Sequence, residues 1–440
     1  MIEINRAKED LLFTFANQIW RLISGPITML LIPLMLSEEQ QGYWYLFGSI
    51  SALSVFSDLG FSNIILQFSA HEYAFLHFTN EGFLGGEKTN LQKLGKFFRF
   101  VTKWIFTISL PIFPIIYLIG IFFFLRDKVL TVYLLPWTLY AVGSYINFIS
   151  NSILSFFEGL DKVSTIQKIR LKASILYTVM ITLILIAGGH IYALAIGMLL
   201  SALFVLISIF REFGKILKQL LKISESFFYD WKKEVFPLFM KYAISFASGY
   251  FVYQIYTPLM HYFHGPVYSG KIGISIALVS SINGISYIWL YTITPKINML
   301  ISQKKWNILD SLVRKRTILS LGTYLCIVLT LSIFLIFFRN FWVIPKIVDR
   351  FLPSISLIIC LSSYFFNLLL NSWGLYLRGH KKELFAIPSV IYAIGVMIST
   401  YLFGKFMPPV WFFTGFLICT ICMIPVDYII YRTWKEKLHG

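Results

Sequence analysis

Residues 147–162 read NFISNSILSFFEGLDK, and residues 367–382, 220 positions further along the chain, read NLLLNSWGLYLRGHKK. Both segments fit the pattern N-x3-N-S-x6-G-x2-K, in which two asparagines, a serine, a glycine and a lysine recur at fixed spacing. Five matches of polar residues or glycine rarely arise by chance. We therefore expect the chain to consist of two structurally repeated halves.

The sequence around these two segments is apolar in blocks that are long enough to cross a bilayer, which takes about 20 residues of helix. Hydrophobic residues make up 57% of the chain and charged residues 13%, with a mean hydropathy of +0.73. A soluble domain carries roughly 25% charged residues. Twelve apolar spans are predicted, near 11–36, 43–70, 97–124, 129–157, 173–189, 190–210, 236–259, 267–294, 317–338, 351–377, 385–404 and 408–431. The expected fold class is therefore an all-α integral membrane protein with twelve transmembrane helices.

The basic residues indicate how these spans are oriented. The termini and the loops after even-numbered spans, together with the residues next to them, hold 28 Lys and Arg. The loops after odd-numbered spans, counted in the same way, hold 7. Cytoplasmic loops carry the positive excess in membrane proteins. Both termini are therefore expected in the cytoplasm. The net charge of +17 is expected to meet anionic membrane lipid, with no role in binding nucleic acid.

The even number of spans in each half predicts how the halves are related. We expect an N-terminal six-helix half at 1–210, a cytoplasmic amphipathic linker at 211–235 and a C-terminal six-helix half at 236–440. Six crossings return the chain to the side from which it started, so both bundles point the same way. A pseudo-twofold axis along the membrane normal follows, as in transporters whose bundles rock around a central site.

Several spans carry polar residues along one helical face, which a helix surrounded by lipid does not need. Packing between helices explains most of the serines in these stripes. The larger polar side chains are the candidates for substrate binding, and they are Asn17, Gln18, Arg21, Asn147, Asn151, Lys241, Tyr250, Gln254, Asn283 and Tyr287. Spans from both halves contribute, which predicts one hydrophilic cavity between them.

The two cations within this set, Arg21 and Lys241, are costly inside a membrane, by at least ~2.5–3.5 kcal/mol each on insertion scales. We expect them to face a wet cavity that binds an anion, although Arg21 could instead form an internal ion pair with Asp58. A guanidinium and an ammonium suit a phosphate or diphosphate group, and aromatic faces with amides suit sugar rings.

Asp58 is the candidate for ion coupling, because a buried carboxylate can bind a proton or a cation. The Leu-Gly pair that follows it argues equally for a structural role at an irregularity in the helix.

The repeated turns supply the candidate gate residues Gly159, Lys162, Gly379 and Lys382. Simple positive-inside anchoring is the alternative explanation for the two lysines.

Catalytic chemistry is not expected in this chain. The four cysteines all fall within predicted spans and are not matched by a second pair of ligands, so no metal site is expected, and no cofactor motif is present. Loops between spans are shorter than 40 residues, which leaves no room for an appended catalytic domain. The protein is therefore not expected to be an enzyme. A membrane-bound glycan polymerase or acyltransferase is disfavoured, because the longest outer loops hold few candidate catalytic residues.

Two motifs resemble those of a known family. The segment GYWYLFGSISALSVFSDLG at 42–60, with Gln67 and the SAHE sequence at 69–72, is similar to the second-helix signature of Wzx-type O-antigen flippases. The FFEGLDK sequence at 156–162 resembles the same family, which belongs to the multidrug/oligosaccharidyl-lipid/polysaccharide exporter superfamily. The twelve spans and the repeat fit the family over the whole length, and Arg21 matches its tendency to place an arginine in the first helix.

The resemblance implies a MATE-like flippase of the bacterial inner membrane. Such a protein moves an undecaprenyl-diphosphate-linked O-antigen or capsule repeat unit from the cytoplasmic to the periplasmic leaflet by alternating access. The partners that it implies are a polysaccharide polymerase and a chain-length regulator. The alternative is a multidrug or cation extruder of the same superfamily that uses an Na⁺ or H⁺ gradient. A cationic cavity would repel cationic drugs, which favours the flippase.

Overall fold

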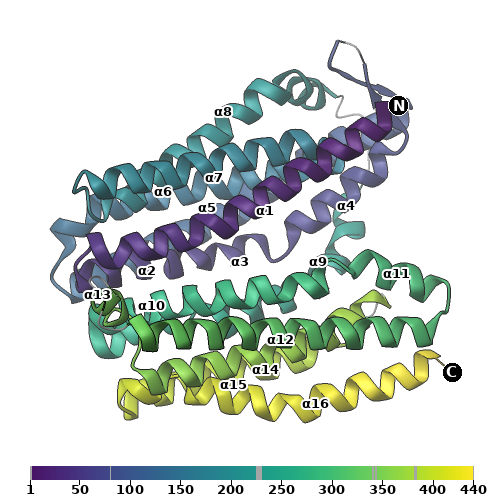
Figure 1. Ribbon diagram of the computed structural model, residues 1–440. Coiled ribbons are helices and arrows are strands. Elements are labelled where there is room, and N and C mark those ends of the chain that lie inside the picture. The colour runs from purple at the N-terminus through teal and green to yellow at the C-terminus, as the bar shows by residue number, and fades with distance from the viewer. Residues whose placement is uncertain are drawn as a thin grey trace. The chain divides into compact units, whose positions relative to one another are not determined.

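The computed structural model describes residues 2–79, 81–223, 230–338, 341, 344–380 and 384–439, without the side chains of residues 2–8, 11, 21, 241, 295 and 439. The described chain is almost entirely helical (Figure 1). Its first half contains α1 (Ile2–Met35), α2 (Glu38–Ser51), η1 (Ala52–Ser54), α3 (Val55–Asp58), α4 (Phe61–Tyr73), β1 (Leu76–Phe78), β2 (Leu84–Gly86), α5 (Lys88–Arg126), α6 (Leu130–Gly159), α7 (Val163–Ile186) and α8 (Tyr192–Lys222). The second half contains α9 (Trp231–Tyr253), α10 (Tyr256–Tyr291), α11 (Thr294–Ser302), α12 (Trp306–Phe338), α13 (Ile344–Val348), α14 (Ser354–Gly379), α15 (Ala386–Phe406), η2 (Pro409–Trp411) and α16 (Thr414–His439).

Ten helical stretches of the described chain are long and apolar enough to cross a membrane, and the bent pair Glu38–Asp58 and Phe61–Tyr73 makes an eleventh. One of the ten, Trp231–Ser302, is 72 residues long. At about 1.5 Å per residue it is several times longer than the ~30 Å hydrocarbon core. Its backbone leaves helical geometry at Gly265, between the predicted seventh and eighth spans. The helices are therefore consistent with the twelve predicted spans.

The predicted second span is broken in its middle by two residues with left-handed backbone. Leu59 has φ 44° and Gly60 has φ 81°, and the helices on either side meet at 43°. Asp58 stabilises the break: its carboxylate accepts hydrogen bonds from the backbone N–H of Gly60 (3.1 Å) and of Ser62 (3.0 Å), and from the Ser62 hydroxyl (2.5 Å). Asp58 thus caps the new helix α4 with its side chain.

Two compact units divide the chain, and neither is continuous in sequence. Unit 1 comprises Met1–Leu31 and Ile50–Ala247, and unit 2 comprises Ile32–Ser49 and Ser248–Gly440. The junction of α1 and α2 thus belongs to unit 2, and the first part of α9 belongs to unit 1. The predicted halves are defined by counting membrane crossings, whereas these units are defined by packing. The predicted division into two halves and a linker therefore stays a prediction.

In unit 1, α6 packs against α4 and α8, and α7 packs against α8. The C-terminal end of α6 is rich in aromatic contacts: the Phe157 ring stacks on Phe213 of α8 with a centroid distance of 4.0 Å. Trp231, at the start of α9, lies 4.7 Å from the ring of Phe97 in α5. Helices in lipid have no hydrophobic driving force to associate, because the lipid tails are as apolar as their side chains. Close packing of this kind therefore holds them together.

The repeated glycine has the same role in both units. A Cβ at Gly159, the last residue of α6, would collide with the Ser69 hydroxyl and the Leu66 carbonyl of α4. A Cβ at Gly379, the last residue of α14, would lie 2.8 Å from Ile297 of α11. Gly159 therefore lets the end of α6 approach α4, and Gly379 lets the end of α14 approach α11.

Unit 2 is built around α14, which packs against α16, α10 and α12. Its segment Ile32–Ser49 is held by the buried Gln41 amide, which donates hydrogen bonds to the carbonyl oxygens of Gly270 in α10 (2.9 Å) and of Arg350, just after α13 (3.2 Å). Gly42 permits this contact, because a Cβ there would collide with the Pro266 carbonyl.

A short β-hairpin follows α4, and the sequence patterns did not predict it. Strands β1 and β2 pair antiparallel, with Leu76 opposite Gly86. The Gln219 side chain of α8 donates to the Leu84 carbonyl (2.7 Å) and accepts from the Leu84 N–H (2.8 Å), as a neighbouring strand would. The predicted linker at 211–235 accordingly begins as a continuation of α8, which runs to Lys222.

Candidate functional site

A polar cavity of about 550 Å³ lies within unit 1. Four helices line it, and each presents one face. The lining residues are Asn17 and Gln18 of α1, Asn147, Asn151 and Leu154 of α6, Gln167, Arg170, Ala173, Ser174 and Tyr177 of α7, and Met198, Ser201 and Val205 of α8. Among these residues Arg170 is the only one with a charged side chain.

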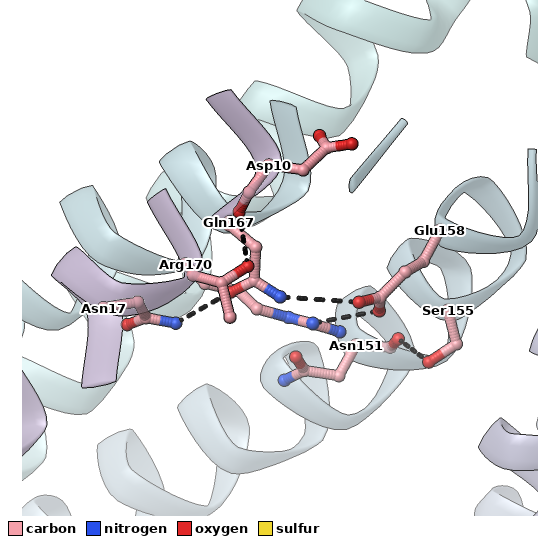
Figure 2. Close-up of polar contacts among 8 residues, drawn as sticks. Asp10, Asn17, Asn151, Ser155, Glu158, Gln167 and Arg170 are labelled. Atoms are coloured by element: carbon pink, nitrogen blue, oxygen red, sulfur yellow. Dashed lines mark hydrogen bonds and ion pairs between the residues drawn. The ribbon is translucent and has the colours of Figure 1, made fainter. Parts of the chain in front are cut away.

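A chain of polar contacts connects side chains of α1, α6 and α7, three of which line the cavity (Figure 2). The Asn17 amide donates to Gln167 Oε1 (3.0 Å), and the Gln167 amide donates to Glu158 Oε1 (3.4 Å). Glu158 Oε2 forms an ion pair with a guanidinium nitrogen of Arg170 at 2.9 Å. The side chains of Arg170 and Glu158 are 28% and 17% exposed, so water screens this pair only partly.

The two predicted asparagines of α6 form a pair. The Asn151 amide donates to both the backbone and the side-chain oxygen of Asn147, at 2.9 Å each. The repeat reproduces this contact in unit 2, where the Asn371 amide donates to Asn367 Oδ1 at 3.1 Å. The sequence repeat therefore encodes the same amide pair in each unit.

Four predicted substrate-binding residues are brought together in unit 1: Asn17, Gln18, Asn147 and Asn151 all line the cavity.

The four candidates of the seventh and eighth spans lie in unit 2. The Tyr250 hydroxyl donates to the Ser49 carbonyl at 3.3 Å, Gln254 is exposed, and the Asn283 side-chain oxygen is buried. Tyr287 lies close enough to Arg378 for an electrostatic interaction. Their role in binding stays a prediction.

Three further candidates lie outside the described part of the chain. They are the side chains of Arg21 and Lys241, and residue Lys382 with its backbone. Lys162 is described, and its ammonium lies 3.9 Å from the centre of the Phe78 ring in β1. Asp58 is occupied with capping α4, which matches the structural role expected for it, and its part in ion coupling stays a prediction.

Sequence reasoning missed the contribution of α7. Gln167, Arg170, Ser174 and Tyr177 follow one another at helical spacing and line the cavity together. The predicted fifth span begins at residue 173, whereas α7 begins at Val163, so a hydropathy profile does not reveal this stripe. The four basic residues between 158 and 172, among them Arg170, fall in the loop before that predicted span. A test for amphipathicity that extends past the apolar core of a span would have found them.

No protein-family model and no curated protein matches this sequence, but solved structures match its fold. An inward-facing multidrug resistance MATE family transporter of the MOP superfamily aligns with a TM-score of 0.60 at 13% identity, over 98% of this chain and 95% of that chain. An outward-facing conformation of such a transporter gives 0.53 at 12% identity, over 99% and 96%. A MATE structure in the straight conformation gives 0.53 at 14% identity, over 99% and 96%.

The protein thus has the fold of MATE transporters over its whole length, which confirms the predicted all-α, MATE-like membrane architecture. Two of the structures that share this fold are described as transporters. Its polar cavity lies inside one helical unit.

Proposed function

We propose that this protein is a flippase that moves an undecaprenyl-diphosphate-linked oligosaccharide from the cytoplasmic to the periplasmic leaflet by alternating access. The observation that supports this most is the chemistry of the unit 1 cavity. Amide side chains and one guanidinium face it, and its described lining contains no carboxylate. Such a surface suits a ligand that is rich in hydroxyl groups and carries negative charge.

Each part of the cavity corresponds to a part of this cargo. The planar guanidinium of Arg170 suits phosphate oxygens. Asn17, Gln18 and Asn151 offer donors and acceptors for sugar hydroxyls. A cavity of about 550 Å³ is within the usual range for small-ligand sites, roughly 300–1,000 Å³, and is large enough for part of a polar head group. The hydrocarbon tail would stay in the bilayer.

The position of Arg170 fits loading from the cytoplasmic leaflet. Arg170 lies seven residues into α7, about 10 Å along its axis from Val163. The distribution of basic loops predicts that this end of the helix is cytoplasmic, where lipid-linked repeat units are assembled. We therefore place the protein in the bacterial inner membrane with both termini in the cytoplasm. A polysaccharide polymerase and a chain-length regulator would act on the cargo after export.

A multidrug extruder that exchanges cationic drugs for Na⁺ or H⁺ is the other class to test. The lining offers such a drug no carboxylate of its own, and the neighbouring acid Glu158 is already paired with Arg170. The described lining therefore offers no unpaired carboxylate that would attract a cationic drug.

The test is the phenotype of cells from which this protein has been depleted. We expect lipid-linked single repeat units to accumulate in the inner membrane and surface polysaccharide to be lost, with drug susceptibility unchanged. Restoring the full chain should reverse both effects. Intact surface polysaccharide, together with increased sensitivity to cationic drugs, would contradict the proposal and favour the extruder.

A further inference from the structure

Glu158 forms an ion pair with Arg170, the one cationic side chain among the described lining residues of the unit 1 cavity. Glu158 is the residue before the terminal glycine of α6, and its two carboxylate oxygens are both engaged: Oε2 pairs with Arg170 (2.9 Å) and Oε1 accepts from Gln167 (3.4 Å). Gln167 is in turn held by Asn17. Three residues that line the cavity are therefore connected, directly or through one neighbour, to one carboxylate (Figure 2).

The internal repeat shows that this carboxylate is not needed to end the helix. Position 158 corresponds to Arg378 in the second half, although both asparagines, the serine and the glycine of the pattern are kept. In α14 the helix ends at Gly379 without an acid at this point. The presence of an acid in unit 1 thus calls for a reason other than the turn itself, and its contact with Arg170 supplies one.

A contribution to folding stability does not explain why an ion pair lies in this position. Desolvation of two partly buried charges offsets most of their attraction, so such pairs contribute little net stability. The same pair has a clear consequence for binding. An anion that uses the guanidinium of Arg170 has to displace the Glu158 carboxylate, and every displacement lowers the observed affinity.

We propose that Glu158 is a tethered competitor for the anionic group of the cargo. The Glu158 carboxylate pairs with Arg170 when the cavity is empty. The phosphate oxygens of an entering diphosphate displace the carboxylate, and the ion pair forms again when the cargo leaves. A diphosphate displaces the carboxylate because it presents more charge and more acceptor oxygens to the same fork of donors. This inference rests on the proposed function and explains how binding of the cargo at the same site stays reversible.

The competitor matters because a transporter has to release what it binds. Affinity differences between related complexes lie mostly in the rate of dissociation. A guanidinium without a competing carboxylate would keep its anion longer. Glu158 is therefore a positioning residue that acts through Arg170 and sets the affinity of the site.

The test measures binding of inorganic diphosphate to the purified full-length protein by calorimetry. Removing the charge in Glu158→Gln, which keeps the shape and a hydrogen-bonding oxygen, should tighten binding by about tenfold. Arg170→Gln should abolish it. Glu158→Asp, which keeps the charge on a shorter side chain, should give an intermediate affinity and serves if the first variant does not fold. Glu436→Gln is the matched control, because Glu436 pairs with Arg432 at an exposed site in α16.

The outcomes separate the two claims. Binding that depends on Arg170 but is unchanged or weakened in both Glu158 variants would overturn the tethered competitor and leave the proposed anion site standing. Equal binding by wild type and Arg170→Gln, or no binding by any variant, would overturn both. Tightening in Glu436→Gln as well as in Glu158→Gln would attribute the effect to net charge alone and would also overturn the competitor.

Discussion

Among single residues, Arg170 does most to define the chemistry of the unit 1 cavity, because the other described lining residues are uncharged. Its guanidinium is always charged and planar, and it presents several donors in fixed geometry. Lysine would keep the charge but lose that fork. The two properties can therefore be separated by substitution.

Arg170→Gln should lower surface polysaccharide at least about tenfold, since a lost hydrogen bond to a charged group costs roughly 1.5–3 kcal/mol. Arg170→Lys should keep partial function. The measurement is complementation of depleted cells at equal membrane levels of protein. Lys172→Gln is the control, because Lys172 is exposed on the same helix and does not line the cavity. Equal loss in both glutamine variants would show that general charge in α7 matters rather than the site.

Asp58 is a second residue whose two possible roles give opposite predictions. As a cap it uses Oδ2 for the Gly60 N–H and Oδ1 for Ser62, and asparagine keeps one of these two acceptors. Asp58→Asn should therefore retain most activity at a small loss of stability, and Asp58→Ala should lower stability by about 1 kcal/mol. As an ion-coupling group it needs the negative charge, and Asp58→Asn would then abolish transport although the protein stays more stable than Asp58→Ala. Thermal unfolding of the purified variants, measured beside complementation, decides between the two.

At the level of elements, the end of α6 is fixed by its close approach to α4. Gly159→Ala should destabilise the protein by about 1–3 kcal/mol, because the added methyl group meets backbone and a short side chain that cannot move away. Gly379→Ala should cost less, since its nearest neighbours are the flexible side chains of Ile297 and Ile301.

The control for these glycine variants is Gly214→Ala in α8, where the added methyl group has no neighbour within 4 Å. Alanine is the better helix former, so this change should be neutral or slightly stabilising. Thermal unfolding in detergent ranks the three variants. A Gly159→Ala protein as stable as Gly214→Ala would refute the close packing described for the end of α6.

For the whole molecule, the sequence-based topology predicts which loops face which side. Single cysteines at Glu39 and Ala187, in a chain without native cysteines, should react with an impermeant maleimide in intact spheroplasts. Cysteines at Thr89 and Ser311 should react only after lysis. All four positions are exposed in the structure, so burial would not prevent labelling. The reverse pattern at two or more sites would refute the arrangement with both termini in the cytoplasm.

Repeat and hydropathy patterns predicted the architecture well, because a helix in lipid needs a long apolar stretch and a repeated contact needs repeated residues. Gly159 and Asn151 could be predicted for this reason, and their counterparts in unit 2 make equivalent contacts. Arg170 and Glu158 could not, because charged ends of helices look like loops in a hydropathy profile. The packing of Ile32–Ser49 with unit 2 depends on tertiary contacts that no local pattern encodes.

The most direct test of the central claim is translocation by the purified protein in liposomes. The probe is a short-chain polyprenyl diphosphate that carries N-acetylglucosamine, and the measurement is the fraction of sugar that becomes inaccessible to an external modifying enzyme. We predict faster transfer than in liposomes without protein, about tenfold slower transfer with Arg170→Gln, and wild-type rates with Lys172→Gln. The central claim would be contradicted if wild-type protein that moves ethidium transferred the probe only at the protein-free rate. Equal rates for wild type and Arg170→Gln would also contradict it.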